Sequence, residues 1–182
     1  MSLLVAAARA VALWQIGVHA KQGWDRKAAY RLAEEYARSV GKPLMVVGGP
    51  WGGNWLRAWL RIPSHGFGDV CVDQNPAACE GCPNCQIITA DIRAIPLPDK
   101  SMGAAFASHI LEHMPTAEDA AQAWQELHRV AEKVYACYPS RFSLSGWLGR
   151  DHHLWVDVAG DTLYIEERNS GRRVVAGTYR LA

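Results

Sequence analysis

Three apolar runs of this sequence end at an acidic side chain or at a group of glycines. Asp73 and Asp91 each close such a run, and Ile92 follows Asp91 directly. A third run stops at a turn rich in glycine, which contains Gly48, Gly49, Gly52 and Gly53. A carboxylate can accept hydrogen bonds from two ribose hydroxyls, an apolar neighbour can hold an adenine, and glycine lets a ligand approach the backbone closely. The three places together predict a site for a ligand that contains a nucleoside.

Histidines supply a second kind of chemistry. Ser108 and His109 follow a fourth apolar run, and we expect both to line the same pocket, with His109 as a candidate catalytic group. Residues 109–113 also read H-x-x-E-H, a zinc pattern that requires a helix with both histidines on one face. Met114 and Pro115 would end such a helix within one turn, so the pattern does not favour peptidase chemistry.

A pair of histidines, His152 and His153, lies nearer the C-terminus. A histidine can take a proton from a nucleophilic acceptor because its pKa lies near neutrality. Adjacent side chains point in different directions, so at most one of the two can act, and His153 is the candidate. The alternative is that both histidines are surface or packing residues.

Three cysteines, Cys79, Cys82 and Cys85, form a C-x₂-C-x₂-C pattern. Thiolates this close suit a tetrahedral metal such as zinc, and we expect a structural site if a metal binds. A closed site needs a fourth ligand, for which Cys71 and His65 are nearest in the sequence. The alternative is that the three are reduced thiols in a loop or that one disulfide forms.

Short apolar runs predict the strands that position these groups. Five buried strands are expected over residues 43–47, 69–73, 86–91, 103–108 and 134–138. Two further strands over residues 162–166 and 174–179, joined by a turn at residues 169–171, form a terminal hairpin.

Helices alternate with these strands. A helix with Asp25 as its N-cap ends at Gly41, and another begins at Thr116, with Asp119 in the position of a capping box. Between them, Trp51, Trp55 and Trp59 recur at helical spacing and predict a short helix packed on the sheet. The alternation indicates an α/β fold, with a parallel sheet covered by helices on both faces.

The first twenty residues are apolar enough to reach across a membrane. Residues 3–20 approach the roughly 20 apolar residues that a span needs, and no basic segment or cleavage site marks a signal peptide. Arg9, Gln15 and His19 fall on one arc of the helix, which favours a packed or interfacial amphipathic helix. A membrane anchor is the alternative. We divide the chain into this helix, residues 1–22, and one domain over residues 23–182.

Composition sets the remaining limits. The chain of 182 residues has 19 basic and 18 acidic side chains, so it lacks the excess positive charge that binds nucleic acid. Five cysteines, an odd number, argue against a secreted disulfide scaffold. We expect a reducing, cytoplasmic location, with the first helix as a means of attachment to the cytoplasmic face of a membrane.

Residues 90–114, ADIRAIPLPDKSMGAAFASHILEHM, resemble a motif of the class I S-adenosylmethionine-dependent methyltransferases. That family shows D-x-x-x-L-P-F-P-D-x-S-F-D, then its fourth strand and h-x-L-E-H. Residues 70–73 are similar to its second strand with the acid that binds ribose. The resemblance covers about residues 43–139. It implies a Rossmann-like, seven-stranded, mostly parallel sheet in the order 3-2-1-4-5-7-6 with a C-terminal β-hairpin.

The resemblance also implies S-adenosylmethionine as cofactor and a methyl acceptor, which we expect to be a small or lipid-like molecule. The implied cofactor contacts are Asp73 for the ribose, Asp91 and Ile92 for the adenine, and the four glycines for the amino-acid part. The first motif departs from the family, because Gly48 replaces the usual acid and Pro50 stands near the first glycine. The alternative function is therefore a non-catalytic binding or scaffold protein tethered by its first helix.

Overall fold

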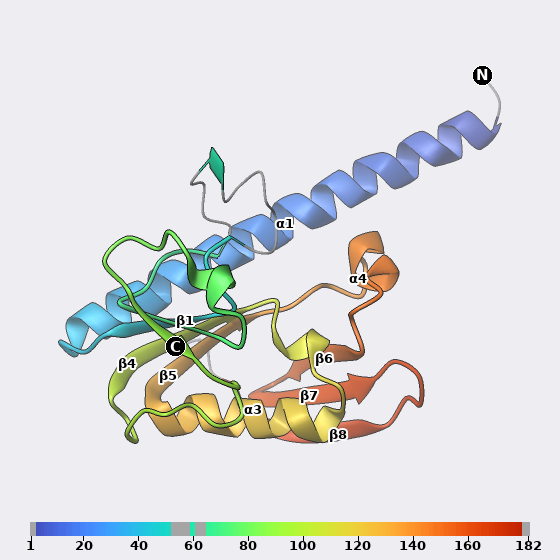
Figure 1. Cartoon of the computed structure of the whole chain (residues 1–182). Coiled ribbons are helices and arrows are strands. Elements are labelled where there is room, and N and C mark those ends of the chain that lie inside the picture. Colours follow the sequence, from blue (N-terminus) through green and yellow to red (C-terminus); the bar gives the residue numbers. More distant parts are fainter. Residues whose placement is uncertain (1–2, 52–58, 61–64, 180–182) are drawn as a thin grey trace.

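A five-stranded parallel sheet forms the centre of the computed structural model, which describes residues 3–51, 59–60 and 65–179 (Figure 1). Its strands are β1 (Leu44–Val47), β2 (Val70–Asp73), β3 (Gln86–Thr89), β4 (Met102–Ser108) and β5 (Ala131–Cys137). They lie in the order β3-β2-β1-β4-β5, with every neighbouring pair parallel. The predicted class and the predicted order of the first five strands are confirmed.

One long helix, α1 (Leu3–Ser39), covers one face of this sheet with its C-terminal half. Ala29, Ala33 and Ala37 are buried there in a cluster with Phe106 and Tyr135. Small residues let the helix approach the sheet closely. The expected start of a second helix at Asp25 is wrong, because the helix runs through that position without a break.

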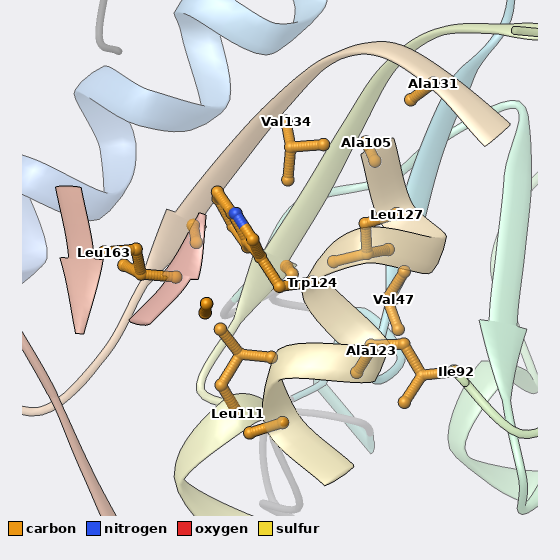
Figure 2. Close-up of a cluster of buried hydrophobic side chains, with 14 of the residues drawn as sticks. Val47, Ile92, Ala105, Leu111, Ala123, Trp124, Leu127, Ala131, Val134 and Leu163 are labelled. Atoms are coloured by element: carbon orange, nitrogen blue, oxygen red, sulfur yellow. The ribbon is translucent and has the colours of Figure 1, made fainter. Parts of the chain in front are cut away.

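A second helix, α3 (Ala117–Val130), covers the opposite face (Figure 1). The Thr116 hydroxyl accepts a hydrogen bond from the Asp119 backbone N–H at 3.1 Å, so the predicted cap is confirmed. Trp124 and Leu127 are fully buried beneath this helix and pack with Val134 of β5 (Figure 2). Both faces of the sheet are therefore covered, as the buried strands required.

The C-terminal strands form a sheet of their own. β6 (Leu154–Ala159), β7 (Thr162–Glu167) and β8 (Arg173–Thr178) pair antiparallel in the order β6-β7-β8. The expected hairpin is present as β7 and β8, but β6 was not expected and the seven strands do not share one sheet. The reason lies at Ala136 of β5, whose N–H donates to the Tyr179 hydroxyl at 3.4 Å and whose carbonyl accepts from it at 3.0 Å. A side chain thus occupies this point on the edge of β5 where a sixth strand would pair.

Short helical segments join these layers and carry several of the groups discussed below. They are η1 (Pro76–Cys79), η2 (Leu111–His113) and α4 (Leu144–Leu148). β3 is an exposed edge strand rather than the buried strand that its apolar residues predicted. Of the predicted tryptophan stripe, Trp51 is buried and Trp59 is exposed, while Trp55 lies outside the described residues.

Candidate functional site

The carboxyl ends of the parallel strands bring the predicted groups to one edge of the sheet. Val47 at the end of β1 is level with Val72 of β2 and Ala107 of β4. Asp73 and Ser108 follow these two residues, so both lie one position beyond the end of β1. This is the edge at which open α/β sheets bind ligands.

Asp73 is held in a tight turn at the end of β2. Its Oδ1 accepts a hydrogen bond from the backbone N–H of Asn75 at 2.7 Å. Asn75 in turn caps η1, because its side chain accepts from the Ala77 N–H. The turn fixes the carboxylate beside the strand end, where the ribose contact was predicted.

Asp91 belongs to an ion-pair network. Both of its carboxylate oxygens accept hydrogen bonds from the Arg93 guanidinium, which also donates to Asp119 at 2.5 Å. These hydrogen bonds to Arg93 hold the pKa of Asp91 below its usual value. Asp91 therefore stays ionised, with much of its acceptor capacity already used.

Ile92 does not lie open beside Asp91. Its side chain is 5% exposed and packs in the core with Val47 and Ala123, under α3 (Figure 2). Contact with an adenine would require this side chain to leave the core. The apolar side chain of Ile92, which we expected to contact a ligand, contacts the protein core instead.

The first two glycines of the turn after β1 are tightly covered. Gly48 and Gly49 have positive φ angles of 89° and 70°. A Cβ on Gly48 would lie 2.0 Å from Cδ1 of Ile110, and a Cβ on Gly49 would lie 2.3 Å from the Ala78 carbonyl oxygen. Other atoms do approach the glycine backbone closely, but these atoms belong to this chain. Gly52 and Gly53 lie outside the described residues.

Ser108 offers a polar group without a partner. Its side chain is fully buried, and its hydroxyl has no hydrogen-bond partner among the described residues. A buried polar atom left in this way costs free energy unless something binds it. Together with the two acids, Ser108 makes this strand edge fit a polar cofactor, although Ile110 and Ala78 narrow it at the glycine turn.

The cysteine cluster is divided in the structure. Cys79 is bonded to Cys71 in a disulfide, with their Cα atoms 6.2 Å apart, and both are fully buried. A disulfide sulfur is not a thiolate, so the expected metal site of Cys79, Cys82 and Cys85 is not supported in this form. Burial raises the pKa of Cys82 and keeps it a neutral thiol. The tight turn that leads into η1 folds back onto β2 and brings Cys71 to Cys79.

A cavity of about 790 Å³ opens between α1 and the ends of β5 and β6. Its walls are mostly apolar, and they include Trp14 and Leu32 of α1, Tyr138, and Val156 of β6. His109 lines it as well, with a φ of 57° in the left-handed region that is unfavourable for a side chain. Nothing in the sequence pattern indicated that α1 would form a wall of this cavity.

His109 and His153 occupy different surroundings. His109 Nδ1 lies 3.1 Å from Oε1 of the buried Glu112. His153 has an exposed side chain, and its backbone N–H donates to the Glu112 carbonyl at 2.8 Å. The cavity therefore contains His109 and leaves out His153. Glu112 was missed as a functional candidate, although it stands in the H-x-x-E-H pattern.

Residues 52–134, a little less than half of the chain, match the family model described as a methyltransferase domain. This part of the chain is similar to a methyltransferase domain. The match covers both acids, Ser108 and the η2 segment, and it runs from before β2 into the first half of β5. No curated protein matches the sequence at a significant level.

Three solved structures are similar to this chain. The [4+2]-cyclase SpnF has 18% identity and a TM-score of 0.39, and the match covers 58% of this chain and 40% of that one. A Burkholderia thailandensis 1,6-didemethyltoxoflavin-N1-methyltransferase with bound S-adenosylhomocysteine has 12% identity and a TM-score of 0.37, covering 98% and 74%. A Pyrococcus horikoshii OT3 protein has 16% identity and a TM-score of 0.43, covering 85% and 76%. The match to this chain thus spans less than half the length of SpnF and about three quarters of the other two.

Proposed function

We propose that this protein transfers a methyl group from S-adenosylmethionine to a small or lipid-like acceptor. The observation that supports the proposal is that Asp73, Asp91 and the Ser108 hydroxyl, which has no partner among the described residues, lie at one edge of the sheet. All three residues fall within the segment that matches a methyltransferase domain. When bound, the cofactor supplies an electrophilic methyl group. Asp73 would accept hydrogen bonds from its ribose hydroxyls. A polar atom of the cofactor would give the buried Ser108 hydroxyl the hydrogen-bond partner that it lacks among the described residues.

His109 is the residue that we propose as proton acceptor. If its Nδ1 carries the proton that Glu112 Oε1 accepts at 3.1 Å, Nε2 keeps a lone pair. His109 follows Ser108 directly in the chain and lines the cavity, so it stands between the cofactor edge and the space for an acceptor. Methyl transfer itself needs mainly alignment of the acceptor with the methyl carbon.

Binding calorimetry on the full chain tests this function. We expect heat on titration with S-adenosylmethionine and with S-adenosylhomocysteine, at one site per chain. The control is Asp161→Asn, a charge change in the turn between β6 and β7, far from the strand edge in the sequence. Absence of heat at high ligand concentration, with circular dichroism showing a folded protein, contradicts the proposal.

The covered glycine turn favours one alternative, a methyltransferase-like protein that binds a partner without catalysis. Ile110 and Ala78 fill the space above Gly48 and Gly49, and the buried Trp51 fixes the same turn by donating to the Glu80 carbonyl at 2.7 Å. Replacement of Ile110 by alanine separates the two functions. We expect Ile110→Ala to strengthen cofactor binding if the turn accepts cofactor, and to leave it undetectable if the protein is a scaffold.

We also propose that the first half of α1 lies along a membrane surface. The helix is long and apolar enough to cross a membrane, and the most apolar part is not buried. Its polar side chains are used within the protein, because Gln15 donates to the Phe142 carbonyl at 3.0 Å and accepts from the Leu144 N–H at 2.9 Å. A spanning helix would break these bonds, whereas an interfacial helix keeps them.

This placement would also bring a lipid-like acceptor to the cavity. Leu13 and Ile16 are more than half exposed, and Trp14, the residue between Leu13 and Gln15, lines the cavity. An apolar molecule could pass from the membrane into the cavity along α1. Flotation with phosphatidylglycerol vesicles measures the attachment. We expect the full chain to float, and Leu13→Gln with Ile16→Gln to remain at the bottom; equal flotation of both would contradict the surface placement.

A further inference from the structure

Three potential metal ligands meet beside η2, and the proposed methyl transfer uses only one of them, Glu112, through its Oε1. Glu112 and His113 belong to η2, and His152 comes from the segment between α4 and β6. One ligand atom of each lies within 4.8 Å of the others. The rings of His113 and His152 are in edge-to-face contact at 4.8 Å, and the hydrogen bond from the His153 N–H to the Glu112 carbonyl joins the two segments.

The Nδ1 atoms of both histidines lie within hydrogen-bond distance of backbone carbonyl oxygens. His113 Nδ1 lies 3.1 Å from the Asp151 carbonyl oxygen and 3.2 Å from its carboxylate. His152 Nδ1 lies 3.1 Å from the Gly146 carbonyl oxygen. A carbonyl oxygen only accepts, so each Nδ1 must carry a proton, and each Nε2 of the neutral ring keeps its lone pair. A second hydrogen bond of this kind accompanies almost every histidine that binds a metal.

Glu112 completes the group with an unused oxygen. Its side chain is 1% exposed, and Oε1 faces His109 Nδ1. Oε2 is buried without a hydrogen-bond partner among the described residues. A buried carboxylate oxygen in this state is costly, and a cation bound beside it removes the cost.

We propose that Glu112, His113 and His152 bind one divalent transition-metal ion. Two imidazoles and one carboxylate form a ligand set that leaves at least one coordination position open. His113 is about one third exposed, which provides a path for the ion and for a further ligand from solvent. His109 contacts both Glu112 and the cavity, so the ion lies one residue away from the space assigned to an acceptor. The proposal concerns binding and stands whether or not the protein methylates anything.

Cobalt(II) is a suitable probe because its absorption spectrum reports the ligand type. The full chain is first stripped with a chelator and then titrated with CoCl₂, in wild type and in a Cys82→Ser/Cys85→Ser variant that removes two free thiols. We expect one ion per chain, visible bands in both proteins, and no near-ultraviolet band of the kind that thiolate ligands produce. Loss of binding in the cysteine variant would place the ion at the thiols and overturn the proposal.

Ligand variants then test two of the three residues. His152→Ala and Glu112→Gln should each weaken cobalt binding at least tenfold. The matched control is His153→Ala, which removes the adjacent exposed imidazole and should change the affinity less than twofold. Glu112→Gln keeps the size of the side chain, so it serves if an alanine variant fails to fold. Unchanged affinity in folded His152→Ala and Glu112→Gln proteins, or no cobalt binding by wild type, would overturn the site.

Discussion

The two halves of the strand edge differ in how their chemistry is assembled. On the side of β1, β2 and β3, each functional group lies in or directly after its own strand, and each was visible as a residue at the end of an apolar run. On the side of β4 and β5, the cavity and the ligand group combine α1, η2, the segment after α4, and β6. The first side is local in sequence, whereas the second side is made by segments that lie more than a hundred residues apart.

The two sides also differ in whether their polar groups already have partners within the protein. Asp91 is paired with Arg93, and the glycine turn is covered by Ile110 and Ala78. Two buried oxygens without a hydrogen-bond partner among the described residues, Ser108 Oγ and Glu112 Oε2, belong to β4 and to η2, the segment that follows it. Ligand binding is therefore expected to gain most on the β4 side, although the recognisable motifs are on the other.

Replacing Trp124 by alanine should have the largest effect, because this residue links the two sheets. Trp124 is fully buried in the core and makes an edge-to-face contact with Tyr179 at 5.6 Å. Loss of a buried tryptophan costs about 3–5 kcal/mol. Urea unfolding should show this loss. A loss below about 1 kcal/mol would mean that the β4 side does not depend on the second sheet. Exposed Trp59→Ala is the control.

Asp73→Ala should weaken binding of S-adenosylmethionine by about 10- to 100-fold, or 1–3 kcal/mol, because two ligand hydroxyls lose their acceptor. Calorimetric titration measures the change, and Asp73→Asn separates charge from hydrogen bonding. Asp99→Ala, a surface carboxylate of an exposed ion pair, should leave affinity unchanged. Equal affinity in wild type and Asp73→Ala would contradict the assignment of Asp73 to the ribose. It would also contradict the prediction that the side of β1, β2 and β3 binds the cofactor.

Tyr179→Phe should destabilise the protein by about 1–2 kcal/mol. The variant keeps the ring in the core but leaves the buried Ala136 N–H and carbonyl without their hydroxyl partner. Thermal unfolding and amide exchange at Ala136 measure the effect, with faster exchange expected. If both stay as in wild type, the hydroxyl does not protect the edge of β5. Tyr164→Phe, in the second sheet, is the matched control.

Arg93→Met should have the smallest effect on stability near pH 7, because the pairs of Arg93 with Asp91 and Asp119 are partly exposed. Both carboxyls have lowered pKa values in the folded protein. Their contribution to stability is therefore present above the ordinary aspartate pKa of about 3.9 and is lost as the pH falls through the folded value. Urea unfolding of both proteins from pH 7 to pH 3 should show the difference shrinking toward zero. A difference that grows on acidification would contradict the network.

Sequence patterns predicted the parallel sheet well because each strand carries its own signal. Apolar runs ending at Val47, Asp73 and Ser108 gave the strand ends to within a residue, and the Thr116 cap placed the start of α3. Ile92 shows the limit of such patterns. An apolar residue after an acid can face a ligand or a core, and only the packing of α3 decided for the core.

The H-x-x-E-H pattern shows the same limit for the site. The sequence set it aside because no helix could place both histidines on one face, and the structure indeed has only the short η2 there. The histidine that joins Glu112 and His113 is His152, about forty residues away. No spacing rule predicts such a partner, because it depends on how the segment after α4 folds back onto η2.

The amino-acid sequence by itself determined the strands of the parallel sheet, their ends, the two acids that follow them and the α/β fold class, because these follow from local hydrophobic patterns. Tertiary structure alone decided that α1 is continuous and walls a cavity, that the last three strands form a separate sheet, that Cys79 pairs with Cys71, and that two histidines meet a buried glutamate. Each of these depends on contacts between segments distant in sequence. Such contacts are set by the packing of the whole chain, and local residue patterns do not encode them.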